Sequence, residues 1–235
     1  MITIHEKGDF SYQTIDGKGL DNGNMPLIQE RLIHYCRSTD VYVDLGAHIG
    51  SMSIPVVAAV KPILAIFVEA NPTAIPLLEE NCKNNLPEQN VLVLNRVVCD
   101  RDELVTFSVL TEKEDSSSFV RPDIIRGGKP VEVLGATLDT LLEDIHGEFF
   151  MKVDIECAEF LMWKGMDKVI PRIRGMIMEW FMNDMTKENA QELLNMIRAK
   201  DFMVVSLDGQ DISDEKLLAA GKEDIVLLNR ALYKL

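Results

Sequence analysis

The chain has 235 residues, of which 47% are hydrophobic and 26% charged, and this composition fits a soluble globular domain with a sizeable core. Lys and Arg number 24 against 38 Asp and Glu, which gives a formal net charge of -14. No basic cluster interrupts that acidity. Because phosphate binding depends on Lys and Arg, the charge predicts that nucleic acid is not a partner.

The four cysteines, at positions 36, 82, 99 and 157, form no CxxC pair and no metal-ligand spacing. A chain of this length needs no disulfide, so we expect reduced thiols in a cytoplasmic compartment. The polar N-terminus lacks the apolar region of a signal peptide. The longest apolar runs are too short to span a bilayer, so no membrane insertion is expected.

Residues 1 to 38 are predicted to form a small N-terminal cap, and residues 39 to 235 the main domain. Glycines separate short β-like pieces in the first part of the cap. From Met25 onward, apolar side chains recur at helical spacing, which predicts one amphipathic helix at the end of the cap.

Residues 41 to 60 have the order strand, glycine turn, helix. A β-branched apolar run reaches Asp44, then Gly46 and Gly50 lie in a turn, and a helical apolar pattern follows from Ser51. Glycine permits a sharp turn and lets a ligand approach the backbone without meeting a Cβ. Nucleotide-binding α/β domains open with such a unit, and their ligands bind beyond the carboxyl ends of the strands.

Strands and helices alternate along the rest of the chain, which favours a doubly wound α/β sheet. In the helix that begins near residue 71, Asn71 is predicted as the N-cap and Pro72 as the first helical residue. Residues 111 to 130 are predicted to form a long mobile loop. The other expected strands are 63–68, 91–94 with 97–98, 104–110, 131–134, 149–155, 173–178, 202–207 and 225–229; the other expected helices are 137–143, one ending at Gly165, and 186–200.

Two acidic residues favour S-adenosylmethionine over NAD as the ligand. Asp44 would be unfavourable beside a pyrophosphate but suits a sulfonium or an ammonium group. Glu69, at the end of the second strand, can accept hydrogen bonds from two ribose hydroxyls. The turn also lacks the third glycine of the dinucleotide fingerprint. Another nucleotide ligand stays open at this point.

A second block, MKVDIECAEFLMWKGM from Met151, resembles the K-D-E-G-x-E…L-K-G block of the FkbM family of S-adenosylmethionine-dependent methyltransferases. The resemblance covers about residues 40 to 182. His48 departs from the family's usual asparagine, and Cys157 replaces the glycine after Glu156. The other matching segments are Val43 to Ala47 with Gly50, Phe67 to Pro72, Leu78 with Glu80 and Asn81, Thr137 to Asp139, and Ile177 to Glu179.

The resemblance implies a Rossmann-like sheet of seven strands, the last antiparallel, with S-adenosylmethionine as the cofactor. Asp44 and the Gly46 backbone would hold its methionine portion, Glu69 its ribose, and the region of Val98 and Asp100 its adenine. Asn71 would orient Glu69 unless it only caps its helix. His48 would serve as a hydrogen-bonding turn residue unless it acts as an acid or base near neutral pH. The implied cofactor-binding residues are Asp44, Gly46, Ala47, His48, Gly50, Glu69, Asn71, Val98 and Asp100.

Methyl transfer requires an aligned acceptor and a group that removes its proton. Asp154 and Glu156 follow an apolar strand and would point to one face if the chain stays extended there. Lys152 lies on the same face and could keep one carboxylate ionised. Asp154, Glu156 and Lys152 are therefore the predicted catalytic residues.

Glu159 and Glu179 are predicted substrate-binding residues. Together with Asp154 and Glu156 they would form a four-carboxylate pocket, which could also take Mg²⁺ or Ca²⁺. In the simpler interpretation, Glu159 stabilises the start of its helix and Glu179 is a solvated strand end.

The predicted function is transfer of a methyl group to a hydroxyl of a small-molecule or sugar-containing metabolite. Two alternatives remain. A non-catalytic nucleotide-binding protein is kept open by Cys157, and an NAD(P)-dependent oxidoreductase is disfavoured by Asp44.

Overall fold

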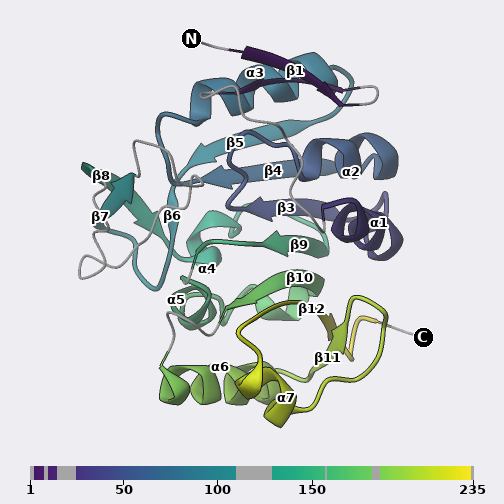
Figure 1. The fold of residues 1–235 in the computed structure, drawn as a ribbon, viewed down its shortest axis with the longest axis vertical. Coiled ribbons are helices and arrows are strands. Elements are labelled where there is room, and N and C mark those ends of the chain that lie inside the picture. The colour runs from purple at the N-terminus through teal and green to yellow at the C-terminus, as the bar shows by residue number, and fades with distance from the viewer. Residues whose placement is uncertain are drawn as a thin grey trace.

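A seven-stranded sheet with the strand order β11-β12-β10-β9-β3-β4-β5 forms the centre of the computed structural model, which describes residues 3–7, 10–14, 25–109, 129–156, 158–181 and 186–233. Neighbouring strands from β10 to β5 are parallel, and β12 runs antiparallel to β10 and β11. Figure 1 shows this sheet from β5 near the top to β11 near the bottom. The predicted doubly wound sheet with its last strand antiparallel is confirmed. Its strands are β3 (Val41–Leu45), β4 (Leu64–Glu69), β5 (Val91–Asn95), β9 (Phe149–Val153), β10 (Ile173–Phe181), β11 (Phe202–Ser206) and β12 (Lys222–Asn229).

The central strands β3 and β9 are buried along their whole length, as expected of parallel strands covered on both faces. Alternate residues of each strand enter different cores. Val43 and Met151 belong to one core, whereas Tyr42 and Phe150 belong to the other. The even-numbered side chains at the ends of both strands therefore lie on the same face as Tyr42.

Helices cover both faces of the sheet (Figure 1). The core that contains Tyr42 lies under α1 (Met25–Tyr35), α2 (Ser53–Val60) and α3 (Ile75–Asn85). The other core lies under α4 (Leu138–Leu141), α5 (Glu159–Lys164), α6 (Lys187–Ala199) and α7 (Asp214–Ala219), and a 3-10 turn, Ile170–Arg172, precedes β10.

No helix in the described ranges is long and apolar enough to cross a bilayer.

The helix predicted to begin at Pro72 begins later. The side chain of Asn71 accepts hydrogen bonds from the N–H and the hydroxyl of Thr73, at 3.0 and 2.7 Å, and this forms a turn before the helix. Helix α3 therefore starts at Ile75, with Pro76 in its first turn, where a missing N–H does no harm.

A second sheet of three strands, in the order β6-β8-β7, follows β5. It comprises β6 (Val97–Val98), β7 (Leu104–Val109) and β8 (Lys129–Ala136). The predicted loop over 111–130 lies mostly outside the described residues, and its last two positions belong to β8.

The predicted cap consists of a hairpin, β1 (Thr3–Lys7) and β2 (Phe10–Thr14), and helix α1. The hairpin lies on α3, where the Ser11 N–H and carbonyl bond the Asn85 side chain at 3.0 and 2.7 Å. Tyr12 is buried in the same core as α1 and α2. The division at residue 38 stays a prediction.

Candidate active site

The turn between β3 and α2 lies tightly against the end of β9. Gly46 and Gly50 have φ of 80° and 86°, in the left-handed region. The N–H groups of Gly46 and Ala47 donate to the carbonyl of Val68 at 2.9 and 3.1 Å. A Cβ on Gly46 would lie 1.8 Å from the carbonyl oxygen of Asp154. Only glycine fits that position, and the β9 backbone is its immediate neighbour.

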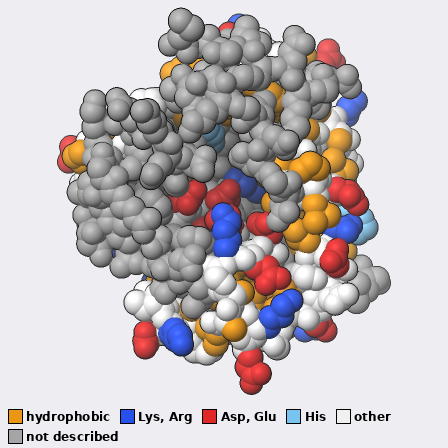
Figure 2. Space-filling view, viewed as in Figure 1, with side chains coloured by type: hydrophobic (Ala, Val, Ile, Leu, Met, Phe, Trp, Pro, Cys, Tyr) orange, Lys and Arg blue, Asp and Glu red, His pale blue; other side chains and the backbone are white. Residues whose placement is uncertain are grey.

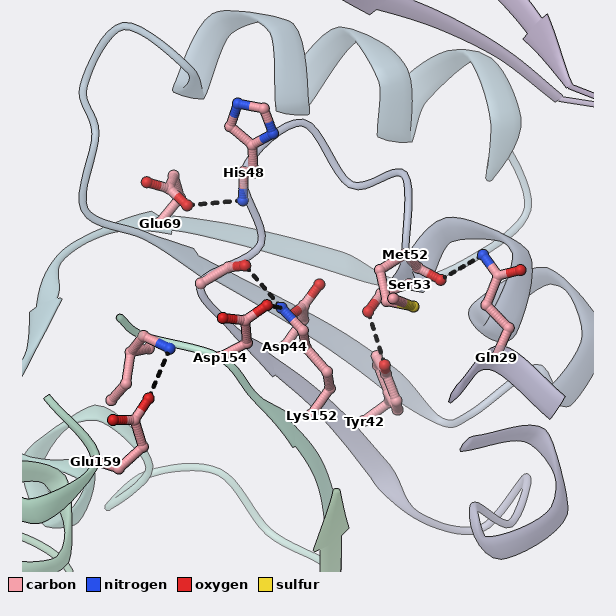
Figure 3. A network of polar contacts seen from close by, with 12 residues as sticks. Gln29, Tyr42, Asp44, His48, Met52, Ser53, Glu69, Lys152, Asp154 and Glu159 are labelled. Atoms are coloured by element: carbon pink, nitrogen blue, oxygen red, sulfur yellow. Dashed lines mark hydrogen bonds and ion pairs between the residues drawn. The ribbon is translucent and has the colours of Figure 1, made fainter. Parts of the chain in front are cut away.

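Glu69 closes the turn from the side of β4 (Figure 3). Its two carboxylate oxygens accept hydrogen bonds from the N–H groups of His48 and Asn71, both at 2.7 Å. Burial raises the pKa of Glu69, and these two N–H groups oppose that rise. Because a carboxylate oxygen has two lone pairs, each oxygen can accept a further bond from a ligand hydroxyl.

The structure also places the two residues whose roles were left open. Asn71 orients Glu69 through its backbone N–H, while its side chain forms the turn with Thr73. His48 has a left-handed backbone with φ of 50°. In Figure 3 the His48 ring points away from Lys152 and Asp154.

Lys152 forms the centre of the polar network below the turn (Figure 3). Lys152 and Asp44 are register partners on β9 and β3 and lie on the same face. The Lys152 Nζ lies 3.3 Å from Asp44 Oδ1 and 3.4 Å from Asp154 Oδ2, and it donates to the Gly46 carbonyl at 2.9 Å. Burial lowers the pKa of Lys152, but the two carboxylates outweigh burial and raise it.

Asp44 is completely buried at 0% exposure. Burial raises the pKa of its carboxyl, and the neighbouring Lys152 lowers it. The prediction paired Asp44 with a cationic ligand. In the structure, the cation beside Asp44 is the side chain of Lys152.

Glu156 does not continue the strand that carries Lys152. Strand β9 ends at Val153, and Glu156 has a left-handed backbone with φ of 52°, so the extended geometry that would align these residues is absent. Burial, followed by the charges of Asp154 and Glu179, raises the pKa of Glu156 to about 7. Cys157 lies outside the described residues.

The two predicted substrate-binding residues have different surroundings. Glu159 starts α5, is buried, and accepts a hydrogen bond from the Ile155 N–H at 3.1 Å. Burial raises its pKa to about 8. Glu179 on β10 forms an ion pair with Lys222 at 2.6 Å. Within the described ranges, no group of three or more His, Cys, Asp and Glu side chains is placed to hold a metal ion.

Lys222 and Asp224 on β12 were missed from the sequence, although they lie beside the predicted acids. Glu179 and Asp224 are register partners, and burial followed by the charge of Asp154 raises the pKa of Asp224. Because β12 is antiparallel, its first residues reach the edge where the parallel strands end. The predicted antiparallel strand was the signal that could have found them. In the view of Figure 2, acidic and basic side chains gather in a hollow near the middle of the molecule.

The residues predicted near adenine lie beyond Glu69. The N–H of Arg96 donates to the Glu69 carbonyl at 3.2 Å, so β6 begins beside the end of β4. Val98 is buried in β6, and Asp100 is half-buried with Oδ1 2.9 Å from the Arg101 Nε. Asp100 therefore has a partner within its own turn.

Comparison with known proteins gives one family match, over residues 25–113, less than half of the chain, to the TRM5/TYW2 methyltransferase domain. Precorrin-6y C5,15-methyltransferase from Geobacter metallireducens is similar with a TM-score of 0.50 and 12% identity, over 92% of this chain and 93% of that chain. Trm5b from Pyrococcus abyssi has a TM-score of 0.50 and 15% identity, over 96% and 54%. TYW2 from M. jannaschii in complex with AdoMet has a TM-score of 0.49 and 17% identity, over 96% and 84%. No curated protein matches the sequence.

The predicted FkbM assignment is wrong, because the family match is to the TRM5/TYW2 domain. O-methylation of a small-molecule hydroxyl, which followed from it, is wrong as well. The exclusion of nucleic acid is also wrong, since the family match is to the TRM5/TYW2 methyltransferase domain. The motifs behind the first error are acids and glycines at strand ends, which other methyltransferases on this fold can share. The exclusion of nucleic acid failed because net charge averages over a whole surface.

The predicted cofactor, S-adenosylmethionine, agrees with the match to a methyltransferase domain. The chain, whose sheet has the order β11-β12-β10-β9-β3-β4-β5 with only β12 reversed among these strands, is similar in fold to the two methyltransferase structures with a TM-score of 0.50. The chain therefore has the fold of the class I S-adenosylmethionine-dependent methyltransferases.

Proposed function

We propose that this chain is an S-adenosylmethionine-dependent methyltransferase that modifies a nucleotide of tRNA. The observation that carries the first part is the Gly46 turn with Glu69 at its side. The turn offers bare backbone to a ligand, and both Glu69 oxygens keep acceptor capacity.

The residues present fit the cofactor. Glu69 can accept the ribose hydroxyls, and the Gly46 to Gly50 turn can receive the methionine portion at its backbone. Val98 supplies an apolar neighbour beyond Glu69 for the base. When bound, S-adenosylmethionine supplies a methyl group on a sulfonium, which a nucleophile can displace.

The carboxylates beyond the turn receive the acceptor and its proton. The Asp154 side chain is 39% exposed, so an acceptor can reach it. Glu156, with a pKa of about 7, is partly ionised near neutral pH and can take the proton that the acceptor loses. Lys152 holds Asp154 at the turn through the contact at 3.4 Å.

The tRNA acceptor is supported by the match of residues 25–113 to the TRM5/TYW2 domain. The charge of -14 opposes it, because RNA phosphates repel an acidic surface. We therefore expect this domain to bind tRNA weakly. Binding should fall steeply as salt rises wherever Lys and Arg contact phosphates.

A thermal-shift titration with S-adenosylhomocysteine, with NAD as the control, tests the cofactor. A ligand at 100 times its Kd adds about 2.7 kcal/mol to the free energy of unfolding. We expect a rise in Tm with S-adenosylhomocysteine, none with NAD, and loss of the rise in Glu69→Ala. A shift with NAD alone would overturn the proposal.

Transfer of labelled methyl groups from S-adenosylmethionine to total tRNA tests the acceptor. We expect label that nuclease digestion releases as a methylated nucleotide, and none in Glu69→Ala. If the cofactor binds but tRNA stays unlabelled across a range of salt concentrations, the tRNA acceptor is wrong and the cofactor assignment stands.

A further inference from the structure

The ammonium group of Lys152 bridges the two halves of the proposed site. One contact, to the Gly46 carbonyl at 2.9 Å, is on the cofactor turn. Another, to Asp154 at 3.4 Å, is on the exposed carboxylate of the acceptor side. The third, to Asp44 at 3.3 Å, is below both. The ammonium group donates a hydrogen bond to Gly46, and its charge lies within 3.4 Å of one carboxylate oxygen of each acid.

Burial decides which of these residues a ligand can touch. Asp44 is 0% exposed and Lys152 is 6% exposed. A ligand on the turn therefore meets the Gly46 backbone and Asp154, while Asp44 and Lys152 lie beneath. Their effect on a ligand must pass through the groups that they hold.

Backbone contacts bring the same segments together. The Asp154 N–H donates to the Leu45 carbonyl at 3.1 Å, and the Asp154 carbonyl packs on the bare Cα of Gly46. These contacts fix the main chains of the two segments. Lys152 adds the link between the turn and the Asp154 side chain.

Resting on the proposed function, we infer that Lys152 is a positioning residue that holds the Gly46 carbonyl and the Asp154 carboxylate in one fixed relation. Asp44 is the buried counter-ion that fixes Lys152. Loss of the Lys152 charge therefore affects cofactor affinity and the acceptor step together. It also removes a cation that lowers the pKa of Glu156.

The test compares wild type, Lys152→Met and Lys200→Met. Lys200 forms an exposed ion pair with Asp167 at 2.7 Å and is the matched control for loss of a lysine. Calorimetry gives the Kd for S-adenosylhomocysteine. The pH profile of kcat is measured for methyl transfer to total tRNA with saturating cofactor. For Lys152→Met we expect a Kd at least about tenfold higher, that is about 1.4 kcal/mol. We also expect the acid limb of kcat to move to higher pH, and Lys200→Met to match wild type.

Lys152→Met leaves Asp44 buried without a counter-ion, and this can unfold the protein. The double variant Asp44→Asn/Lys152→Met removes both charges and keeps similar volumes, so it serves for the same two measurements. A merely structural ion pair would change Tm and leave Kd and the pH limb at their wild-type values, and that result would overturn the inference. If wild type itself does not bind S-adenosylhomocysteine, the proposed function fails, and this inference fails with it.

Discussion

The carbonyl oxygen of Asp154 occupies the space where a side chain on Gly46 would begin. A Cβ built on Gly46 meets that oxygen at 1.8 Å, and the backbone of Gly46 is left-handed with φ of 80°. Two constraints therefore act on one residue. The steric one links the Gly46 turn to the strand end that carries the Asp154 carboxylate.

Gly46→Ala should lower the free energy of unfolding and abolish binding of S-adenosylhomocysteine. The left-handed backbone alone costs an L-residue about 1–2 kcal/mol, and the clash with Asp154 adds to that cost. Gly209→Ala is the matched control, because Gly209 has φ of 78° and, among the described residues, its Cβ would meet only the Tyr35 hydroxyl, at 3.9 Å. Urea unfolding and calorimetry check both variants. Equal losses of stability, with cofactor binding kept in Gly46→Ala, would contradict the steric argument.

Arg174 and Asp40 form a buried ion pair between β10 and the residue before β3, exposed by 0% and 1%. The Arg174 Nε lies 3.2 Å from Asp40 Oδ1. Arg174→Met leaves the Asp40 carboxylate buried without its cation, which should cost about 3–5 kcal/mol of stability. Lys200→Met breaks an exposed pair and should cost less than about 1 kcal/mol. Urea unfolding decides, and similar small losses in both variants would refute this role for Arg174.

The sequence was informative where the pattern is local. Continuous apolar runs predicted β3 and β9, and the glycine spacing predicted the turn, because burial on both faces and backbone freedom leave direct marks on residue choice. Helix α3 shows the limit of such signals. The Asn71-Pro72 pair resembles a helix start, but the Thr73 backbone and hydroxyl compete for the Asn71 side chain.

The pairing of Lys152 with Asp154 followed from their alternation along one strand, but its pairing with Asp44 could not be predicted, because it depends on register between distant segments. The sequence indicated that Asp44 needs a cation, and the structure supplies Lys152 from a strand more than a hundred residues later. The left-handed conformation of Glu156 also escaped prediction, since its side chain gives no sign that the chain leaves the extended path there. Helix α7 was missed although Ser213 caps it and Asp214 follows.

Glu159 should make the protein less stable as pH rises from about 4.5 to about 8. Its folded pKa is about 8 against an ordinary value of 4.5, so in this range the native state holds a proton that the unfolded state has lost. Stability from this group is full below the unfolded pKa and declines by up to about 1.4 kcal/mol per pH unit. Glu159→Gln keeps an acceptor for the Ile155 N–H and cannot ionise. Urea unfolding at pH 5, 6.5 and 8 should show that the free energy of unfolding of the variant rises relative to that of wild type as pH rises. A difference in free energy that does not change with pH would exclude this linkage.

Glu156 should set the acid limb of the pH profile of kcat. Its pKa of about 7 means that protonation below neutral pH removes the base that takes the acceptor's proton. Glu156→Gln should lose that limb and lower kcat by about 10²–10⁴-fold. Steady-state rates between pH 5.5 and 9 measure both effects. A variant that keeps the limb would assign the proton transfer to another group.

The same residue should separate stability from activity, because Glu156 combines a left-handed backbone of φ 52° with a half-buried carboxyl. Glu156→Gly removes the steric cost of that backbone, about 1–2 kcal/mol, and the cost of taking the carboxyl out of water. The flexibility of glycine in the unfolded state offsets part of this gain in stability. We expect a variant at least as stable as wild type that binds S-adenosylhomocysteine and has lost turnover. Strained backbone positions cluster at functional sites, so the φ of Glu156 motivates this test. A Glu156→Gly protein that is less stable and fully active would show that the conformation serves the fold and not the chemistry.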